Sequence, residues 1–275
     1  MIAAARGPRS FGWNGCVTSE HAAFFDEHGF IAFRNVFSER ELDVVREEAD
    51  RLEVRTLAGE LPPNDIDLQG GVDPSGRRFL NRLLYFTEYC PRARAVIFDT
   101  CFAVARGLLG ARAWVIEDTP PGTVRQVKVG GVQGGVAAID WHVDNFTVAD
   151  ADAPILPVIA IGIYLEESRR GNGNLHVVPA THRAPLARAI VEPLSLEAEP
   201  GDVIVHATSV LHASGPMAPE STTRRDILYV FASGGAYPGH RSDVFLALRR
   251  RQREAELEPA FLDGPLLAHS VTFAR

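Results

Sequence analysis

The hydrophobic pattern of the chain changes near residue 112, and this change limits the possible folds more than any other feature. Downstream of it, short runs rich in β-forming residues recur at 113–117, 124–129, 136–143, 158–165, 175–178, 203–206 and 227–231. Turn residues separate these runs, as in Pro120-Pro121-Gly122 and Gly171-Asn172-Gly173-Asn174. Many short strands joined by turns favour a β-sandwich or a jelly roll, and the lack of strand–helix alternation argues against a doubly wound sheet.

Upstream of this point the pattern is helical around one strand. Helices are predicted over 19–28, over 39–52 and over 91–109, with a strand at 30–33. Ser19 is expected to cap the first helix and Gly29 to end it. Ser38 and Glu41 have the spacing of a capping box in front of the second helix.

Two irregular segments are candidates for loops that cover a site. Residues 57–78 mix Gly, Pro, Asp and Asn without periodicity, and a loop of that length predicts a functional flap. Residues 145–154 form the second candidate.

The chain of 275 residues is expected to form one domain over 1–275. Its parts would be a helical region over about 19–110, a β core over about 112–235 and a charged tail over 236–275. The apolar fraction of 46% is ordinary for a globular protein with a full core.

Charge and cysteine content exclude several classes of protein. There are 28 Lys+Arg against 35 Asp+Glu, a net charge of −7, and Lys128 is the only lysine. This balance argues against nucleic acid or an anionic membrane as the main partner. No apolar run is long enough to span a membrane, and the first 16 residues do not read as a signal peptide. Three widely spaced cysteines fit a reducing cytoplasm, the expected location, while the oligomeric state stays open.

The motif with the clearest chemistry is His142-Val143-Asp144. On a strand, residues i and i+2 project from the same face, so His142 and Asp144 can reach one point. His212 is the best candidate for a third ligand. Two imidazoles and one carboxylate form the facial triad of non-haem Fe(II) oxygenases, which leaves positions open for cosubstrate and O₂.

A 2-oxo acid bound to such an iron needs a cation for its far carboxylate. Arg224 and Arg225 lie 12 and 13 residues past His212, at the start of a predicted strand. The planar guanidinium of arginine holds a carboxylate with two hydrogen bonds, which makes this pair the candidate anchor.

Together these motifs resemble the phytanoyl-CoA dioxygenase family of Fe(II)- and 2-oxoglutarate-dependent oxygenases, from about Ser19 to Ala232. The matching blocks are 24–30 (F-x-x-x-G-[FY] type), 141–144 (W-H-x-D), 173–183 (G-x-L-x-x-x-P-G-[ST]-H, with Ala180 in place of the usual glycine), and 200–203 with 212–216 and 224–225 (distal histidine block).

The resemblance implies a double-stranded β-helix, a jelly-roll or cupin-like core with the metal near its open end. It assigns iron to His142, Asp144 and His212. By alignment of the following strand it assigns the cosubstrate carboxylate to Arg224, although the family spacing also allows Arg225. Further cosubstrate contacts are implied for Ser214, Gln126 and Lys128.

Candidate substrate residues are fewer. Asn145 and Phe146 follow the iron motif and are expected to line the mouth of the site or a wall of its pocket. His182 and Arg183 lie in a family segment, where an arginine could bind an anionic substrate group, although a solvent-facing turn explains them equally well.

The expected activity is oxidation of a small organic substrate, with release of succinate and CO₂. Asp144 favours hydroxylation over halogenation, since related halogenases have Ala or Gly at this position. The substrate is expected to be an intermediate of secondary metabolism. The alternatives are desaturation, epimerisation or ring closure by the same site, a cupin-like metal enzyme that does not use 2-oxoglutarate, and an inactive binding module.

Overall fold

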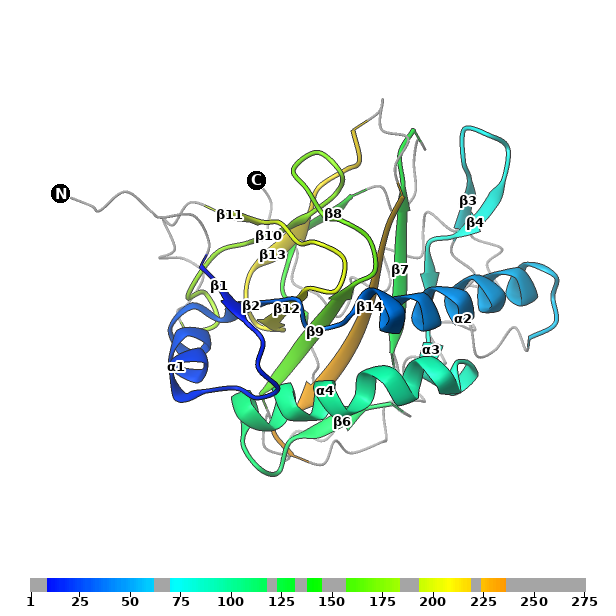
Figure 1. Ribbon diagram of the computed structural model, residues 1–275. Helices are drawn as coiled ribbons and strands as arrows, with labels where there is room; N and C mark the ends of the chain where they lie inside the picture. Colours follow the sequence, from blue (N-terminus) through cyan, green and yellow to red (C-terminus); the bar gives the residue numbers. More distant parts are fainter. Residues whose placement is uncertain are drawn as a thin grey trace, which may run out of the picture.

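A computed structural model of the chain describes residues 9–61, 70–117, 123–131, 138–144, 157–183, 193–218 and 224–235 (Figure 1). Asn145, Phe146, the segment 145–154 and the tail 236–275 lie outside these residues. The described part is mainly β with helices near the N-terminus, as the periodicity predicts. Among its helices, none is long and apolar enough to cross a membrane.

Three helices of the described residues match predicted ones, and the short helix over 86–89 was not predicted. The helices are α1 (Ser19–His28), α2 (Glu39–Leu57), α3 (Phe86–Tyr89) and α4 (Pro91–Leu109). The capping box of Ser38 and Glu41 is present at α2, and Gly29 ends α1 in the left-handed conformation with φ 77°. The prediction of Ser19 as the cap of α1 is wrong, because Thr18 accepts the hydrogen bond from the His21 amide.

The larger of the two main sheets has eight strands. They are β1 (Ser10–Gly12), β2 (Phe30–Arg34), β12 (Val203–Ala207), β9 (Val158–Tyr164), β14 (Arg224–Ser233), β7 (Val124–Val129) and β5 (Arg82–Leu83) in spatial order, with β6 (Trp114–Ile116) also paired to β14. All neighbours are antiparallel except β1 and β2. Short segments such as 10–12 and 82–83 were not predicted as strands, because two or three residues carry no measurable periodicity.

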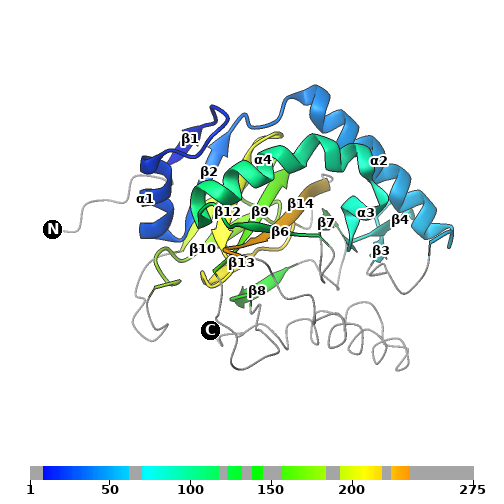
Figure 2. The same cartoon turned by 90° about the horizontal axis from the view of Figure 1, so that it is seen from below.

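The smaller sheet has four strands in the order β11 (Leu194–Leu196), β10 (Leu175–Val177), β13 (His212–Ser214) and β8 (Ile139–His142). Figure 2 shows α2 and α4 on one side of the large sheet and β8, β10 and β13 on the other. A separate ribbon of β3 (Gly70–Val72) and β4 (Arg78–Leu80) lies within the segment predicted to be irregular. The prediction of 57–78 as a loop is therefore wrong for these strands.

Successive side chains along β14 point alternately to the two faces of the large sheet. Leu228 and Val230 are fully buried in the main core, on the face that α4 covers. Arg225 projects from the opposite face and donates a hydrogen bond to the carbonyl of Gly173, in the turn before β10 of the small sheet. The space between the two sheets therefore receives side chains from both of them, and the candidate site is built there.

Candidate metal and cosubstrate site

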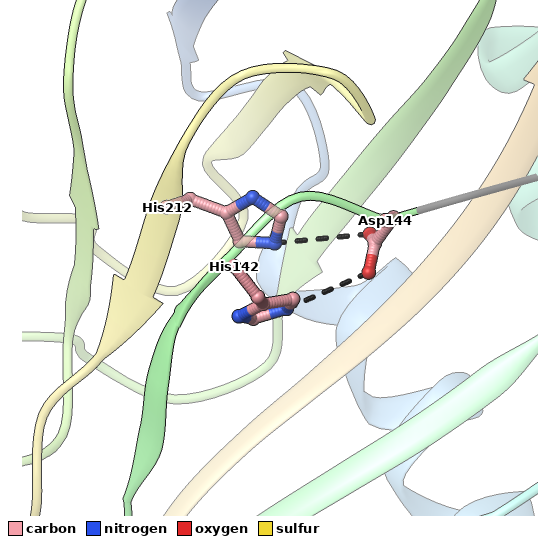
Figure 3. Close-up of side chains that lie close together, drawn as sticks. All are labelled: His142, Asp144 and His212. Atoms are coloured by element: carbon pink, nitrogen blue, oxygen red, sulfur yellow. Dashed lines mark ion pairs between the residues drawn. The ribbon is translucent and has the colours of Figure 1, made fainter. Parts of the chain in front are cut away.

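His142, Asp144 and His212 lie together between the two sheets (Figure 3). Strands β8 and β13 are antiparallel neighbours, and their register sets His142 directly opposite His212. Asp144 follows β8 by two residues. Its Oδ1 lies 3.5 Å from the Nε2 of His142, and its Oδ2 lies 3.7 Å from the Nε2 of His212. The structure thus brings together the three residues that the sequence selects.

Backbone carbonyl groups fix the orientation of both imidazoles. The Nδ1 of His142 donates to the carbonyl of Asp140 at 2.6 Å, and the Nδ1 of His212 donates to the carbonyl of Val210 at 2.8 Å. A carbonyl oxygen can only accept, so Nδ1 carries the proton in each neutral ring. The Nε2 atoms are therefore left with lone pairs that point toward the carboxylate, the arrangement found in histidine metal ligands.

The charge states of Asp144 and His212 also suit a cation, whereas for His142 burial lowers the pKa and the pairing with Asp144 raises it by more. Burial lowers the pKa of His212 to about 3, with a further contribution from His206 that outweighs the Asp144 charge. Burial by itself raises the pKa of Asp144, but its close contacts with His142 and His212 lower that pKa further than burial raises it. Asp144 is thus ionised and His212 is neutral near pH 7, and both are in the form that binds metal.

This set of donors fits a divalent transition metal. Two ligands at about 2.1 Å from a metal and at right angles to each other are about 3 Å apart, and the Nε2–carboxylate distances are close to this value. Two imidazoles and one carboxylate on one side leave the other coordination positions for exogenous ligands, as in a non-haem iron site.

Arg225 has an unusual environment for a fully buried arginine. Its Nη1 donates to the Gly173 carbonyl, whereas Nε and Nη2 have no hydrogen-bond partner among the described residues. Burial lowers the pKa of Arg225, and the groups that offset this are the hydroxyls of Tyr229 and Tyr164 and the more distant Asp226. A buried cation with two unused donors is costly unless an anion joins it.

Arg224, the residue assigned by alignment, points the other way. Its Nη2 forms an ion pair with the buried Glu53 of α2 at 2.9 Å. The structure does not support Arg224 as the anchor, because neighbouring residues on a strand face opposite sides and a shift of one residue exchanges the faces. Arg225, the alternative that the sequence left open, projects toward the small sheet.

Lys128 and Ser214 link the two sheets beside Arg225. The Nζ of Lys128 donates to Ser214 Oγ at 2.8 Å and to the Gly215 carbonyl at 2.9 Å. Ser214 Oγ in turn donates to the Gly173 carbonyl at 2.8 Å, the same acceptor that Arg225 uses. Lys128 lies directly opposite Arg225 in the β7–β14 register. The predicted cosubstrate residues Lys128 and Ser214 therefore adjoin Arg225.

Gln126 is two residues before Lys128 and so lies on the same face of β7. It is 4% exposed, and no acceptor in the described part of the chain bonds to its Nε2. The structure thus places this predicted residue in the space between the sheets, with an unused donor.

His182 and Arg183 lie against α1. The Nε2 of His182 is 3.1 Å from the carbonyl of Asp26, and Arg183 forms an ion pair with the Asp26 carboxylate. No contact seen within the described residues joins either side chain to the triad. Their role in substrate binding remains a prediction.

The sequence analysis selects neither Tyr164 nor His206 as a site residue. Tyr164 is fully buried on β9, and its hydroxyl has no hydrogen-bond partner within the ranges that the structure describes. It lies opposite Ile227 of β14, two residues from Arg225. The His206 ring contacts the His212 ring at a tilt of 45°, with 4.4 Å between the ring centroids. Tyr164 is the last residue of β9, and the other residues of that strand are apolar or glycine. A hydroxyl at the end of such a strand is the feature of the sequence that could have identified it.

The matches to known proteins agree with this geometry. A family model described as phytanoyl-CoA dioxygenase covers residues 25–225, most of the chain. The chain belongs to the phytanoyl-CoA dioxygenase family. By this membership it is a non-haem Fe(II)- and 2-oxoglutarate-dependent dioxygenase, which confirms the predicted class of enzyme and its cofactors. No curated protein matches the chain at a significant level.

Solved structures with a similar fold include three bacterial proteins. AviO1 from Streptomyces viridochromogenes Tue57 has a TM-score of 0.61 and 21% identity, over 79% of this chain and 95% of that chain. EctD from S. alaskensis, with 2-oxoglutarate and 5-hydroxyectoine, has a TM-score of 0.63 and 22% identity. The match covers 85% of this chain and 84% of that chain. EvdO2 from Micromonospora carbonacea var. aurantiaca, complexed with 2-oxoglutarate, has a TM-score of 0.59 and 18% identity. The match covers 82% of this chain and 96% of that chain. These matches confirm the predicted double-stranded β-helix.

Proposed function

We propose that this chain binds Fe(II) through His142, Asp144 and His212, binds 2-oxoglutarate beside it, and hydroxylates a small organic substrate. The observation that carries the proposal is that the triad and the unsatisfied Arg225 lie in the same space between the two sheets. When bound, iron supplies the activation of O₂ that oxidises 2-oxoglutarate to succinate and CO₂. The chain supplies ligands, charge and position.

Arg225, in place of Arg224, would hold the far carboxylate of 2-oxoglutarate. Its Nε and Nη2 lack partners, and these two donors can bind one carboxylate in the forked geometry of arginine. The Tyr164 hydroxyl is a third donor, because burial raises the pKa of Tyr164 and keeps its proton in place. Lys128 adds a second buried positive charge directly across the strand pair.

Ser214 would position these groups. Its hydroxyl accepts from Lys128 and donates to the Gly173 carbonyl, and its backbone belongs to the strand that carries His212. The same hydrogen-bonded chain thus connects a metal ligand strand to the cosubstrate anchor. This connection supports a role for Ser214 and Lys128 in setting the distance between iron and 2-oxoglutarate.

The binding experiment uses purified protein, Fe(II) and 2-oxoglutarate without oxygen. Bidentate binding of the 2-oxo acid to iron should produce a weak visible charge-transfer band, and admission of O₂ should yield succinate. Absence of both the band and succinate would contradict the proposed cosubstrate.

Hydroxylation is the reaction that the intact Asp144 carboxylate favours, and we propose a secondary-metabolite intermediate as substrate. The mass of the product distinguishes the outcomes, since hydroxylation adds one oxygen, desaturation and ring closure remove two hydrogens, and epimerisation leaves the mass unchanged. A product without added oxygen would contradict hydroxylation while leaving the iron site intact.

A further inference from the structure

Arg82 is an arginine on the inner face of the large sheet that the proposed function does not use. It lies on β5, the strand next to β7 at the end of the sheet, and its register partner is Gln126. Residues directly opposite each other in an antiparallel pair project from the same face. Arg82 therefore shares a face with Gln126, Lys128 and Arg225, and its neighbour Leu83 faces the helix-covered core.

Among the residues that the structure describes, no carboxylate forms an ion pair with Arg82. The side chain is half-buried, and within the described ranges it has neither an ion pair nor a hydrogen-bond acceptor. The buried Arg125 of the adjacent strand differs sharply, because carboxylates of Asp226, Glu53 and Asp50 surround it. An arginine partly removed from water without an acid nearby is prepared for an anion that arrives from solution.

Two further observations place this anion close to the triad. The pKa values of His142 and Tyr229 are both raised, and the charge of Arg82 opposes each rise; the charge of Asp144 also acts on Tyr229, so these groups share one neighbourhood. In addition, the buried Nε2 of Gln126 has no acceptor and lies across the strand pair from Arg82.

Arg82 and Arg225 leave the backbone at different places on the inner face of the large sheet. The two residues are on strands β5 and β14, with β7 between them, which separates them by about 9–10 Å across the sheet. Their register partners on β7, Gln126 and Lys128, are two residues apart, which adds about 7 Å along the strands. The two arginines therefore start from separate positions on this face, and the affinity of an Arg82 variant for 2-oxoglutarate tests whether they bind separate anions.

We propose that Arg82 and Gln126 bind a carboxylate of the organic substrate, so that the substrate is an organic acid oriented with its acidic end toward β5. The guanidinium fork offers two donors to the two carboxylate oxygens, and the Gln126 amide offers a third. This inference rests on the proposed function, and it assigns Gln126 to the substrate in place of the cosubstrate.

The test uses a panel of small aliphatic and aromatic carboxylic acids, each with its primary amide. Dissociation constants are measured by calorimetry on anaerobic protein loaded with Fe(II) and 2-oxoglutarate, and again on metal-free protein. For at least some scaffolds, the wild type should bind the acid about tenfold or more tightly than the amide, as expected for a charge-assisted hydrogen bond. Amides that bind as well as the acids throughout the panel would overturn the proposal.

Three variants locate the preference. Arg82→Gln should abolish the acid preference, and Arg82→Lys should retain part of it. Arg78→Gln is the control, because Arg78 is an exposed arginine on β4 and its loss changes the net charge equally. An acid preference that survives Arg82→Gln, or that falls equally with Arg78→Gln, would overturn the assignment.

The affinity for 2-oxoglutarate separates this inference from the proposed function. Arg82→Gln should leave the 2-oxoglutarate dissociation constant unchanged, and a large increase would mean that Arg82 serves the cosubstrate. If the wild type fails to bind 2-oxoglutarate, the proposed function fails, while the acid preference of the metal-free protein still reports on Arg82.

Discussion

Arg125 and Arg225 are both buried to within 1% of full burial on neighbouring strands, yet they project from opposite faces of the large sheet. Arg125 donates to the Asp226 carboxylate and to the carbonyl of Ala49 on α2, and so ties the helix layer to the sheet. Arg225 has no such acid and faces the triad side. One arginine thus has a structural environment, and the other has an environment suited to a ligand.

Replacement of Arg225 should weaken 2-oxoglutarate binding selectively. Arg225→Gln removes the forked cation, and we expect the 2-oxoglutarate dissociation constant to rise by about tenfold or more, the effect of losing a hydrogen-bonded charge pair. The variant should fold, because it removes a buried charge that has no acid partner. Calorimetry with 2-oxoglutarate provides the measurement.

Arg224→Gln is the matched control for that experiment. It removes the same charge one residue earlier, on the face toward Glu53, and should change 2-oxoglutarate affinity by less than about twofold. If Arg224→Gln weakened 2-oxoglutarate binding and Arg225→Gln did not, the assignment of Arg224 from the family resemblance would be right and the proposed anchor Arg225 would be wrong.

Removal of a triad ligand should abolish metal binding. We expect about one Fe(II) or Co(II) per chain in the wild type, because three donors converge on one point, and a loss of tight binding in His212→Ala and Asp144→Ala. His176→Ala is the control, since His176 is half-buried on β10 with its ring near Trp141. Metal content after gel filtration reports the result, and full occupancy in either triad variant would exclude that residue as a ligand.

Glu53 should contribute strongly to stability. It is 2% exposed on α2, accepts from the Leu80 amide at 2.7 Å, and pairs with both Arg125 and Arg224. Glu53→Gln leaves the partner charges less compensated, and we expect a loss of about 3 kcal/mol in the free energy of unfolding, measured in urea.

The exposed Glu47 of the same helix provides a comparison. It pairs with Arg51 and Arg92 on the surface, where solvent screens the charges, and Glu47→Gln should leave stability unchanged within error. Equal losses in the free energy of unfolding would show that the buried ion pairs of Glu53 contribute no more to stability than the surface pairs of Glu47.

The three thiols should react at very different rates. Cys16 is exposed, whereas Cys90 and Cys101 are buried. Burial raises the pKa of Cys90 to about 12, so at pH 8 its thiol is protonated as well as inaccessible. A disulfide reagent should label one thiol of the native protein rapidly and the other two only after unfolding. Fast labelling of more than one would contradict the packing of α4 against the core.

Features set by local spacing could be predicted from the sequence. The i, i+2 relation of His142 and Asp144 follows from strand geometry, and the capping box at Ser38 follows from its own four residues. Strand β7 was predicted with its observed bounds because its residues alternate or are β-branched and turns flank it. The predicted convergence of His212 on this pair depended on the known order of the motifs.

Features set by the register between distant strands could not be predicted. The choice between Arg224 and Arg225 depends on which face of β14 meets the helices, and a one-residue shift reverses it. Arg82 was missed because β5 has two residues and no periodicity, so that its face became known only from its pairing with β7. Tyr164 could not be selected because it is the last residue of an otherwise apolar strand, where a tyrosine is most simply read as part of the core.

The division of the site between two sheets has a consequence for the behaviour of the whole molecule. The two histidines belong to β8 and β13 of the small sheet, and Arg225 and Tyr164 belong to the large one. Metal and cosubstrate bound together would act as a removable cross-link between the layers. The resistance of the protein to heat and proteolysis then depends on its cofactor supply, and iron-starved cells would hold it in its most easily degraded form.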